Sequence, residues 1–320
     1  MTEFELIRRY FTERQPPQAY VPLGIGDDCA LMSARAGMQL AVSSDMLVEG
    51  RHFFAGADAR MLGHKALAVN LSDLAAMGAE PRAFTLALAL PEAREDWLQE
   101  FSQGLFDLAQ RHGCQLIGGD TTRGPLTISI TVLGEVAPAL ALRRDAGRPG
   151  DDLWVSGELG DARLALAGYL QQQVLPASEQ EQSGMRMHMP LPRVQLGLAL
   201  RGIAHAAIDI SDGLAGDLKH VLHRSGLGAT LWCDSIPVGA VLAKQDRRLQ
   251  REFCLSGGDD YELCFSAPAA HRAAVLAAAQ QAATPVSRIG YLETTPGLRI
   301  VDAQDQLQFF QLSSFDHFIS

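Results

Sequence analysis

The sequence predicts a mixed α/β (or α+β) fold in two halves, and three observations lead to this prediction. Strand-like and helix-like stretches alternate along all 320 residues. Apolar residues make up 47% and charged residues 20% of the chain, which is the composition of a globular protein. A stretch rich in Ala, Arg, Pro and Gly at 138–150 separates the alternating strands and helices of the first half from those of the second half. We therefore expect one domain over 1–137 and a second over 138–320.

The elements of the first half are predicted from their apolar periodicity. A helix is expected over 62–77, ending at Gly78, and an amphipathic helix over 97–111. Strands are expected where β-like runs are bounded by turn residues. They fall at 38–43 (running into Ser44-Asp45), 84–90, 115–117 (turning at Gly118-Gly119) and 126–136.

The second half repeats the alternation. Helices are expected at 161–170, 193–205, 214–224 and 269–283. Strands are expected at 153–156, 207–210, 229–233, 262–265, 287–289 and 298–301. The polar stretch 171–189 is expected to be a mobile loop.

Charge and motif content exclude several classes of protein. The net charge is −10, so nucleic acid and anionic membranes are poor partners, and no basic patch interrupts the acidic sequence. No apolar run, including 84–90, is long enough to cross a bilayer. No P-loop, no third glycine of a dinucleotide fingerprint and no protein-kinase motif set is present, and Lys65, Lys219 and Lys244 are the only lysines.

The cysteines and the N-terminal residues favour a cytoplasmic location. The five cysteines are an odd number without a CxxC pair, which is typical of reduced thiols, and we expect all five to be small core residues. Residues 1–5 include two glutamates where a signal peptide would have basic residues.

The most informative feature is a set of aspartates in six short motifs rich in Gly or Ser, most of them expected at turns and one, at 70–73, inside the helix expected over 62–77. Carboxylate oxygens are the ligands that Mg²⁺ prefers, and several acids in one place would need cations to offset their repulsion. The alternative for any single aspartate is a helix N-cap or an Asx-turn. The motifs are at 24–28, 43–45, 70–73, 118–122, 209–213 and 256–260.

Taken together, the motifs resemble the thiamine-monophosphate kinases, a family in the superfamily that includes aminoimidazole ribonucleotide synthetase and selenophosphate synthetase. The resemblance covers nearly the whole chain in the same motif order. The motifs are GIGDDCA at 24–30, SSDMLVEGRHF at 43–53, KALAVNLSDLAAMGAEP at 65–81, LIGGDTTRG at 116–124, IDISDGLAGDL at 208–218, SGGDDYELCF at 256–265 and FDHF at 315–318.

The resemblance implies a kinase that phosphorylates thiamine monophosphate to thiamine diphosphate with ATP, the final step in making that cofactor. It implies several Mg²⁺ ions and a homodimer whose N-terminal α/β domains pair in a β-barrel. We expect the transfer to be direct and in line, because an ionised phosphate acceptor needs no strong general base. The N-terminal domain would then bind metal and ATP, and the C-terminal domain would complete the ATP and substrate sites.

The resemblance also implies roles for individual residues. Metal ligands are expected at Asp28, Ser44, Asp45, Asp73, Asp120, Asp209 and Asp212, with Asp120 and Asp212 essential for catalysis. ATP contacts are expected at Gly119, Asp120, Arg144 and Ser211, and substrate contacts at His52, Asp259 and Phe315.

Two of these residues depart from the family pattern, and two other functions stay open. Asp259 stands where the family usually has Glu, and Phe315 where it usually has Trp or Tyr. Phe315 and Phe318 could instead pin the C-terminal tail to its domain. The rival functions are a synthetase that uses ATP to activate an oxygen, and a sensor that binds thiamine phosphate or nucleotide without turnover.

Overall fold

The computed structural model describes residues 2–16 and 18–310, and the chain falls into two compact units. Unit 1 comprises the chain up to Leu74 together with Ala79–Ala139. Unit 2 comprises Ala75–Gly78 and the chain from Leu140 onward. In the described part of the chain, no helix combines the length and apolar character needed to span a membrane.

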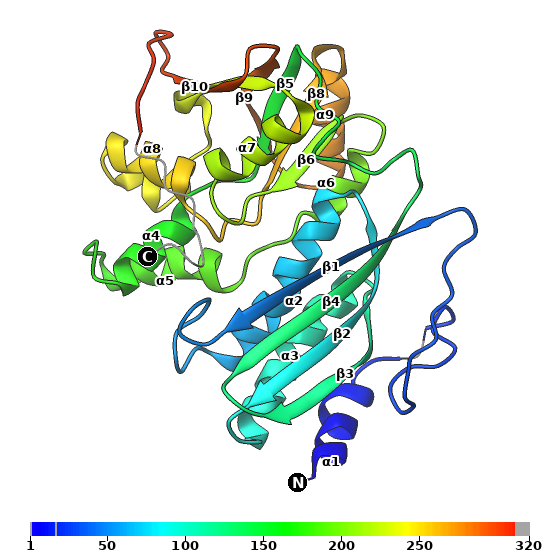
Figure 1. Ribbon diagram of the computed structural model, residues 1–320. Coiled ribbons are helices and arrows are strands. Elements are labelled where there is room, and N and C mark those ends of the chain that lie inside the picture. The colour runs from blue at the N-terminus through cyan, green and yellow to red at the C-terminus, as the bar shows by residue number, and fades with distance from the viewer. Residues whose placement is uncertain (1, 17, 311–320) are drawn as a thin grey trace. The chain divides into compact units, whose positions relative to one another are not determined.

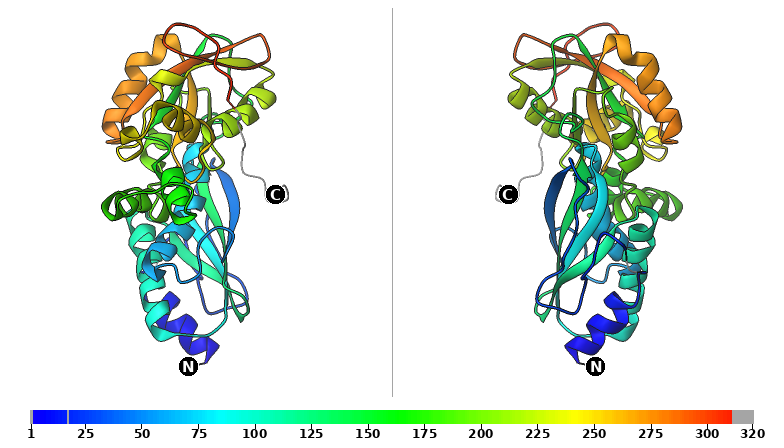
Figure 2. Two further views of the ribbon diagram at one scale, coloured as in Figure 1. Left: turned by 90° about the vertical axis from the view of Figure 1, so that its left-hand side faces the viewer. Right: turned by 90° about the vertical axis from the view of Figure 1, so that its right-hand side faces the viewer.

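Unit 1 is a four-stranded sheet with helices on one face. The strand order is β1-β4-β2-β3, with β2 and β3 parallel and the other neighbours antiparallel. Helices α2 and α3 lie against the same face of this sheet (Figures 1 and 2). The elements are α1 (Glu3–Ile7), the π-helical turn η1 (Arg8–Thr12), β1 (Gln39–Val48), α2 (Ala59–Ala76), β2 (Glu80–Leu90), α3 (Glu95–Arg111), β3 (Gln115–Arg123) and β4 (Thr127–Val136).

Unit 2 is a six-stranded mixed sheet in the order β10-β7-β9-β5-β8-β6, in which only β10 and β7 are parallel neighbours. Its strands are β5 (Asp151–Ser156), β6 (Ala206–Asp209), β7 (Gly228–Trp232), β8 (Leu263–Pro268), β9 (Val286–Glu293) and β10 (Gly297–Val301). Its helices are α4 (Asp161–Tyr169), α5 (Ala177–His188), α6 (Val194–Ala199), α7 (Leu214–Ser225), α8 (Arg247–Ser256) and α9 (Arg272–Gln281), with 3₁₀ turns η2 (Cys233–Ser235), η3 (Leu242–Lys244) and η4 (Ala269–His271).

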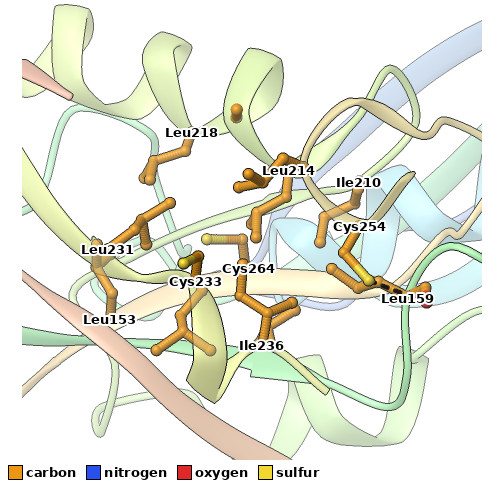
Figure 3. Close-up of a cluster of buried hydrophobic side chains, with 14 of the residues drawn as sticks. Leu153, Leu159, Ile210, Leu214, Leu218, Leu231, Cys233, Ile236, Cys254 and Cys264 are labelled. Atoms are coloured by element: carbon orange, nitrogen blue, oxygen red, sulfur yellow. Dashed lines mark hydrogen bonds between the residues drawn. The ribbon is translucent and has the colours of Figure 1, made fainter. Parts of the chain in front are cut away.

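The core of unit 2 includes three of the cysteines among aliphatic side chains (Figure 3). Cys254 Sγ lies 3.4 Å from the Leu159 carbonyl oxygen, and burial raises the pKa of Cys264 to about 12. All five cysteines are free, and four are buried. Cys29 is exposed, so the expectation that all five are core residues was wrong for this one.

The mixed α/β class is confirmed, but three local predictions were wrong. Gly118-Gly119 is not a turn, because β3 continues through it to Arg123 along β2. The stretch 171–189 is not a loop throughout, since it contains α5, tied to α4 by Gln180 Nε2 donating to the Ala165 carbonyl at 3.0 Å. The helix expected over 193–205 is only the six-residue α6. For Gly118-Gly119 the pairing of β3 with β2 overrode the local turn signal.

Candidate active site

The acidic groups of unit 1 begin where strand β1 faces helix α2. Ser43 Oγ donates to Asp73 Oδ2, and the backbone N–H of Asp45 donates to Asn70 Oδ1 at 3.1 Å. Asn70 is itself oriented by donating from Nδ2 to the Ala66 carbonyl at 3.0 Å. Ser43 and Asp45, two apart on β1, lie on the same face of the strand, and Asn70 and Asp73, three apart on α2, lie on the same face of the helix. These two faces meet each other. The structure therefore places Asp45 and Asp73 on two elements that face each other.

Ser44 points away from this group because side chains alternate along a strand. Its Oγ lies 3.0 Å from Thr131 Oγ1 and donates to the Ile130 carbonyl at 3.2 Å. The hydroxyl beside Asp73 is that of Ser43, which the sequence reasoning did not select. If the strand expected over 38–43 had been extended to Asp45, its alternation would have placed Ser43 and Asp45 on the same face.

Asp120 and Gly119 lie on β3, at the edge of the sheet opposite β1. Three inter-strand spacings of about 4.8 Å separate the two edge strands, roughly 14 Å in all. Gly119 is required by a close approach, because an added Cβ would lie 1.9 Å from the Leu86 carbonyl oxygen. Asp120 is exposed, so its carboxylate can meet a ligand in solution.

Asp28 and His52 occupy loops of unit 1. Asp28 is exposed, and its backbone N–H donates to Asp27 Oδ1 at 2.8 Å. His52 lies in the turn after β1, where its Nδ1 accepts from the Val48 backbone N–H at 3.0 Å. This bond assigns the proton of the neutral ring to Nε2.

In unit 2, the loop after β6 and the loop before β8 are joined through their backbones. The Asp259 N–H donates to the Ser211 carbonyl at 2.9 Å, and the Tyr261 N–H donates to the Ile210 carbonyl at 2.8 Å. Gly258 lies so close that an added Cβ would be 2.4 Å from the Ser211 carbonyl oxygen. The motifs at 209–213 and 256–260 therefore form one structural element, which brings Ser211 and Asp259 together.

Two non-glycine residues of this element have left-handed backbones. Asp259 has φ 66° and Tyr261 has φ 50°, and Tyr261 Oη donates to Asp259 Oδ1 at 3.2 Å. Such conformations cost on the order of 1 kcal/mol or more and cluster at functional sites. The strain supports the selection of Asp259 as a ligand-facing residue.

Asp217, in the first turn of α7, holds the turn between Asp209 and Gly213. Its Oδ2 accepts from the backbone N–H groups of Ser211 and Asp212, both at 3.1 Å. Burial raises the pKa of Asp217 to about 7, while Arg144 lies close enough to oppose that shift. Arg144 is exposed, and its carbonyl accepts from Ser225 Oγ at 2.9 Å. Asp212 thus lies just before the start of α7, while the backbone of Arg144 lies at the C-terminal end of that helix.

Behind the strained loop are two buried acids that the sequence reasoning did not select. Asp260 accepts from the Gly160 N–H at 3.0 Å, and burial raises the pKa of Asp260 well above its usual range. Glu262 accepts from Ser156 Oγ at 2.6 Å, from Arg186 at 2.7 Å, and from Arg193 Nε and Nη2 at 2.6 and 2.5 Å. This bidentate ion pair anchors the segment that follows Asp259.

The donor atoms of both units fit Mg²⁺ better than zinc. They are carboxylate, hydroxyl and amide oxygens, and the described residues contain no group of three or more His, Cys, Asp or Glu that could hold a metal. Mg²⁺ usually keeps several waters and is bound by one or two carboxylates plus substrate phosphates, so a few acids on facing elements, such as Asp45 on β1 and Asp73 on α2, suit it better than a dense cluster of ligands. Phe315 lies outside the described residues.

Comparison with known proteins first defines the class to which this fold and these residues belong. Residues 26–136 match the family model of the AIR synthase related protein, N-terminal domain. Residues 148–303 match the AIR synthase related protein, C-terminal domain.

Individual relatives narrow the class. A thiamine-monophosphate kinase from Salmonella typhimurium is 44% identical over 99% of this chain and 98% of its own length. The crystal structure of thiamine-monophosphate kinase from Stenotrophomonas maltophilia is 47% identical, with a TM-score of 0.87 over 94% of this chain and 96% of that one. A structure of AaThiL complexed with AMPPCP and TMP is 27% identical, with a TM-score of 0.76 over 92% of both chains. This chain belongs to the thiamine-monophosphate kinase family of AIR synthase related proteins, as its motifs predicted.

Proposed function

We propose that this protein transfers the γ-phosphoryl group of ATP to thiamine monophosphate and so makes thiamine diphosphate, the final step in the biosynthesis of that cofactor. The observation that supports this most strongly is 44% identity to a thiamine-monophosphate kinase over 99% of the chain. The structure of AaThiL with AMPPCP and TMP supports the same pair of substrates. The acidic oxygen ligands on β1, α2 and the loop after β6 suit the Mg²⁺ that such a reaction needs.

The transfer is direct and in line, without a phospho-enzyme. The acceptor is a phosphate oxygen that is already ionised at neutral pH, so no strong general base is needed. Bound Mg²⁺ ions would supply the charge neutralisation that lets two anionic phosphates approach each other. Asp28, Asp45, Asp73 and Asp120 would hold them in unit 1, and Asp209 and Asp212 would hold them in unit 2. The side chain of Ser44 faces Thr131 on the other side of β1, so Ser43 and not Ser44 is the hydroxyl beside Asp73.

The remaining site residues bind the two substrates. ATP is held at Gly119 and Asp120 on β3, at Ser211 in the loop before α7, and at Arg144. Thiamine monophosphate is held by His52, Asp259 and Phe315. A carboxylate and an aromatic face suit the permanently cationic thiazolium ring.

The protein also works as a homodimer in the cytoplasm, joined through unit 1. The edge strand β1 exposes large apolar side chains on one face, with Leu40 49%, Val42 60% and Met46 55% exposed. Contiguous apolar surface of this kind favours an interface, and pairing two such sheets closes them into a barrel without free edges. We expect Val42→Glu to convert the dimer to a monomer in light scattering. The control Val174→Glu, at a residue 98% exposed in unit 2, should remain dimeric.

One incubation separates this function from its rivals. The protein is mixed with ATP, Mg²⁺ and thiamine monophosphate, and the products are separated by chromatography. Thiamine diphosphate and ADP are expected in equal amounts. Inorganic phosphate without thiamine diphosphate would indicate a synthetase, and unchanged substrates would indicate a binding protein. A labelled phospho-enzyme trapped with ATP alone would refute direct transfer.

A further inference from the structure

The turn between Asp209 and Gly213 has its backbone groups already committed. Asp217 Oδ2 accepts from the N–H groups of Ser211 and Asp212, both at 3.1 Å. The Ser211 carbonyl accepts from the Asp259 N–H at 2.9 Å. Both backbone hydrogen-bonding groups of Ser211 therefore have protein partners.

This arrangement limits how the turn can meet a phosphate. Successive backbone N–H groups that point outward form a nest for anions. Here the two N–H groups point at a carboxylate that is only 4% exposed, so they are turned toward the protein interior. A phosphate cannot reach them without displacing Asp217. What Ser211 can offer a nucleotide is its side-chain hydroxyl.

We propose that Asp217 is a positioning residue that turns these two amides inward, so that Ser211 binds the nucleotide through its hydroxyl. The proposal rests on the proposed function only in taking Ser211 as a nucleotide contact. Asp217 also links the turn to the neighbouring loop. By accepting from the Asp212 N–H it orients the peptide between Ser211 and Asp212, and the carbonyl of that peptide accepts from the Asp259 N–H.

Positioning and simple electrostatics predict opposite results at Asp217. Its carboxylate lies near Asp212 and Arg144, and removing a negative charge near an anionic nucleotide would by itself tighten binding. Asp217→Asn and Asp217→Ala both remove the charge. Only Asn keeps a side-chain oxygen that can accept from both amides. If Asp217 acts by position, the alanine variant weakens nucleotide binding and the asparagine variant does not.

The chain offers a matched control for the loss of a capping carboxylate. Asp246 Oδ1 accepts from the N–H groups of Arg248 and Leu249 at 3.0 and 3.1 Å, the same two-amide pattern at the start of α8. Asp246 has no part in the proposed site. Asp246→Ala therefore reports what losing such a cap does to the fold alone.

The test is calorimetric binding of AMPPCP with Mg²⁺ to the full chain, with melting temperature measured in parallel. Asp217→Ala should weaken AMPPCP binding about tenfold or more, and Asp217→Asn should bind within threefold of wild type. Ser211→Ala, which keeps the backbone amide, should also lose about tenfold. Asp246→Ala should bind as wild type does.

Any of three results would overturn the proposal. One is Ser211→Ala binding within twofold of wild type, because the hydroxyl would then make no contact. A second is a folded Asp217→Ala protein that binds within twofold of wild type. A third is Asp217→Asn losing as much binding as Asp217→Ala. If Asp217→Ala does not fold, the serine and asparagine variants still decide. Because AMPPCP binding needs no turnover, a wild-type protein that binds it but makes no thiamine diphosphate refutes the proposed function and leaves this test intact.

Discussion

His112, at the C-terminal end of α3, should make unit 1 less stable in mild acid. Its Nδ1 is buried without a hydrogen-bond partner, and burial, helped by Arg111 and His64, lowers the pKa of His112 from 6.5 to about 4. Between these values the unfolded chain binds a proton that the folded chain excludes, so stability falls as the pH drops from 6.5 toward 4. The full shift corresponds to about 3 kcal/mol, of which about 2 kcal/mol is already lost at pH 5.

The assay is urea unfolding of wild type and His112→Leu at pH 8 and at pH 5. Leucine fills similar space and takes up no proton, so His112→Leu should lose about 2 kcal/mol less than wild type between the two pH values. His220→Leu, at an exposed position on α7, is the control and should change with pH as wild type does. Equal pH dependence of wild type and His112→Leu would refute the reasoning, because the pKa of His112 would then be the same in the folded and unfolded chains.

Three further predictions concern the site. Asp120→Ala should abolish turnover while leaving the melting temperature within a few degrees, since Asp120 is exposed; near wild-type kcat in excess Mg²⁺ would contradict its role as a ligand. Glu262→Gln should lower the free energy of unfolding in urea by roughly 3 kcal/mol, because it leaves the cations of Arg186 and Arg193 without their buried partner. A loss below about 1 kcal/mol would show that water takes the place of the lost carboxylate. Phe315→Ala should raise the KM for thiamine monophosphate several-fold and leave the KM for ATP nearly unchanged, whereas equal losses for both substrates would favour tail pinning.

The sequence by itself determined the elements whose periodicity is strong and local. The predicted helix over 97–111 is confirmed as α3, which buries Leu98 and Phe101, and the helix that ends before Gly78 is confirmed as α2. Gly78 has φ 61°, the left-handed geometry that ends helices. Family membership also followed from the motifs alone, because their order and residue types are read directly along the chain.

Tertiary structure alone decided how the motif residues are presented. That Ser43 and not Ser44 faces Asp73 depends on which face of β1 packs against α2. That Gly119 lies inside a strand depends on its pairing with Leu86 of β2. The union of the loops at Ser211 and Asp259 depends on hydrogen bonds between segments almost fifty positions apart. Such contacts form only when burial brings distant segments together, and no periodicity or propensity within a single segment encodes them.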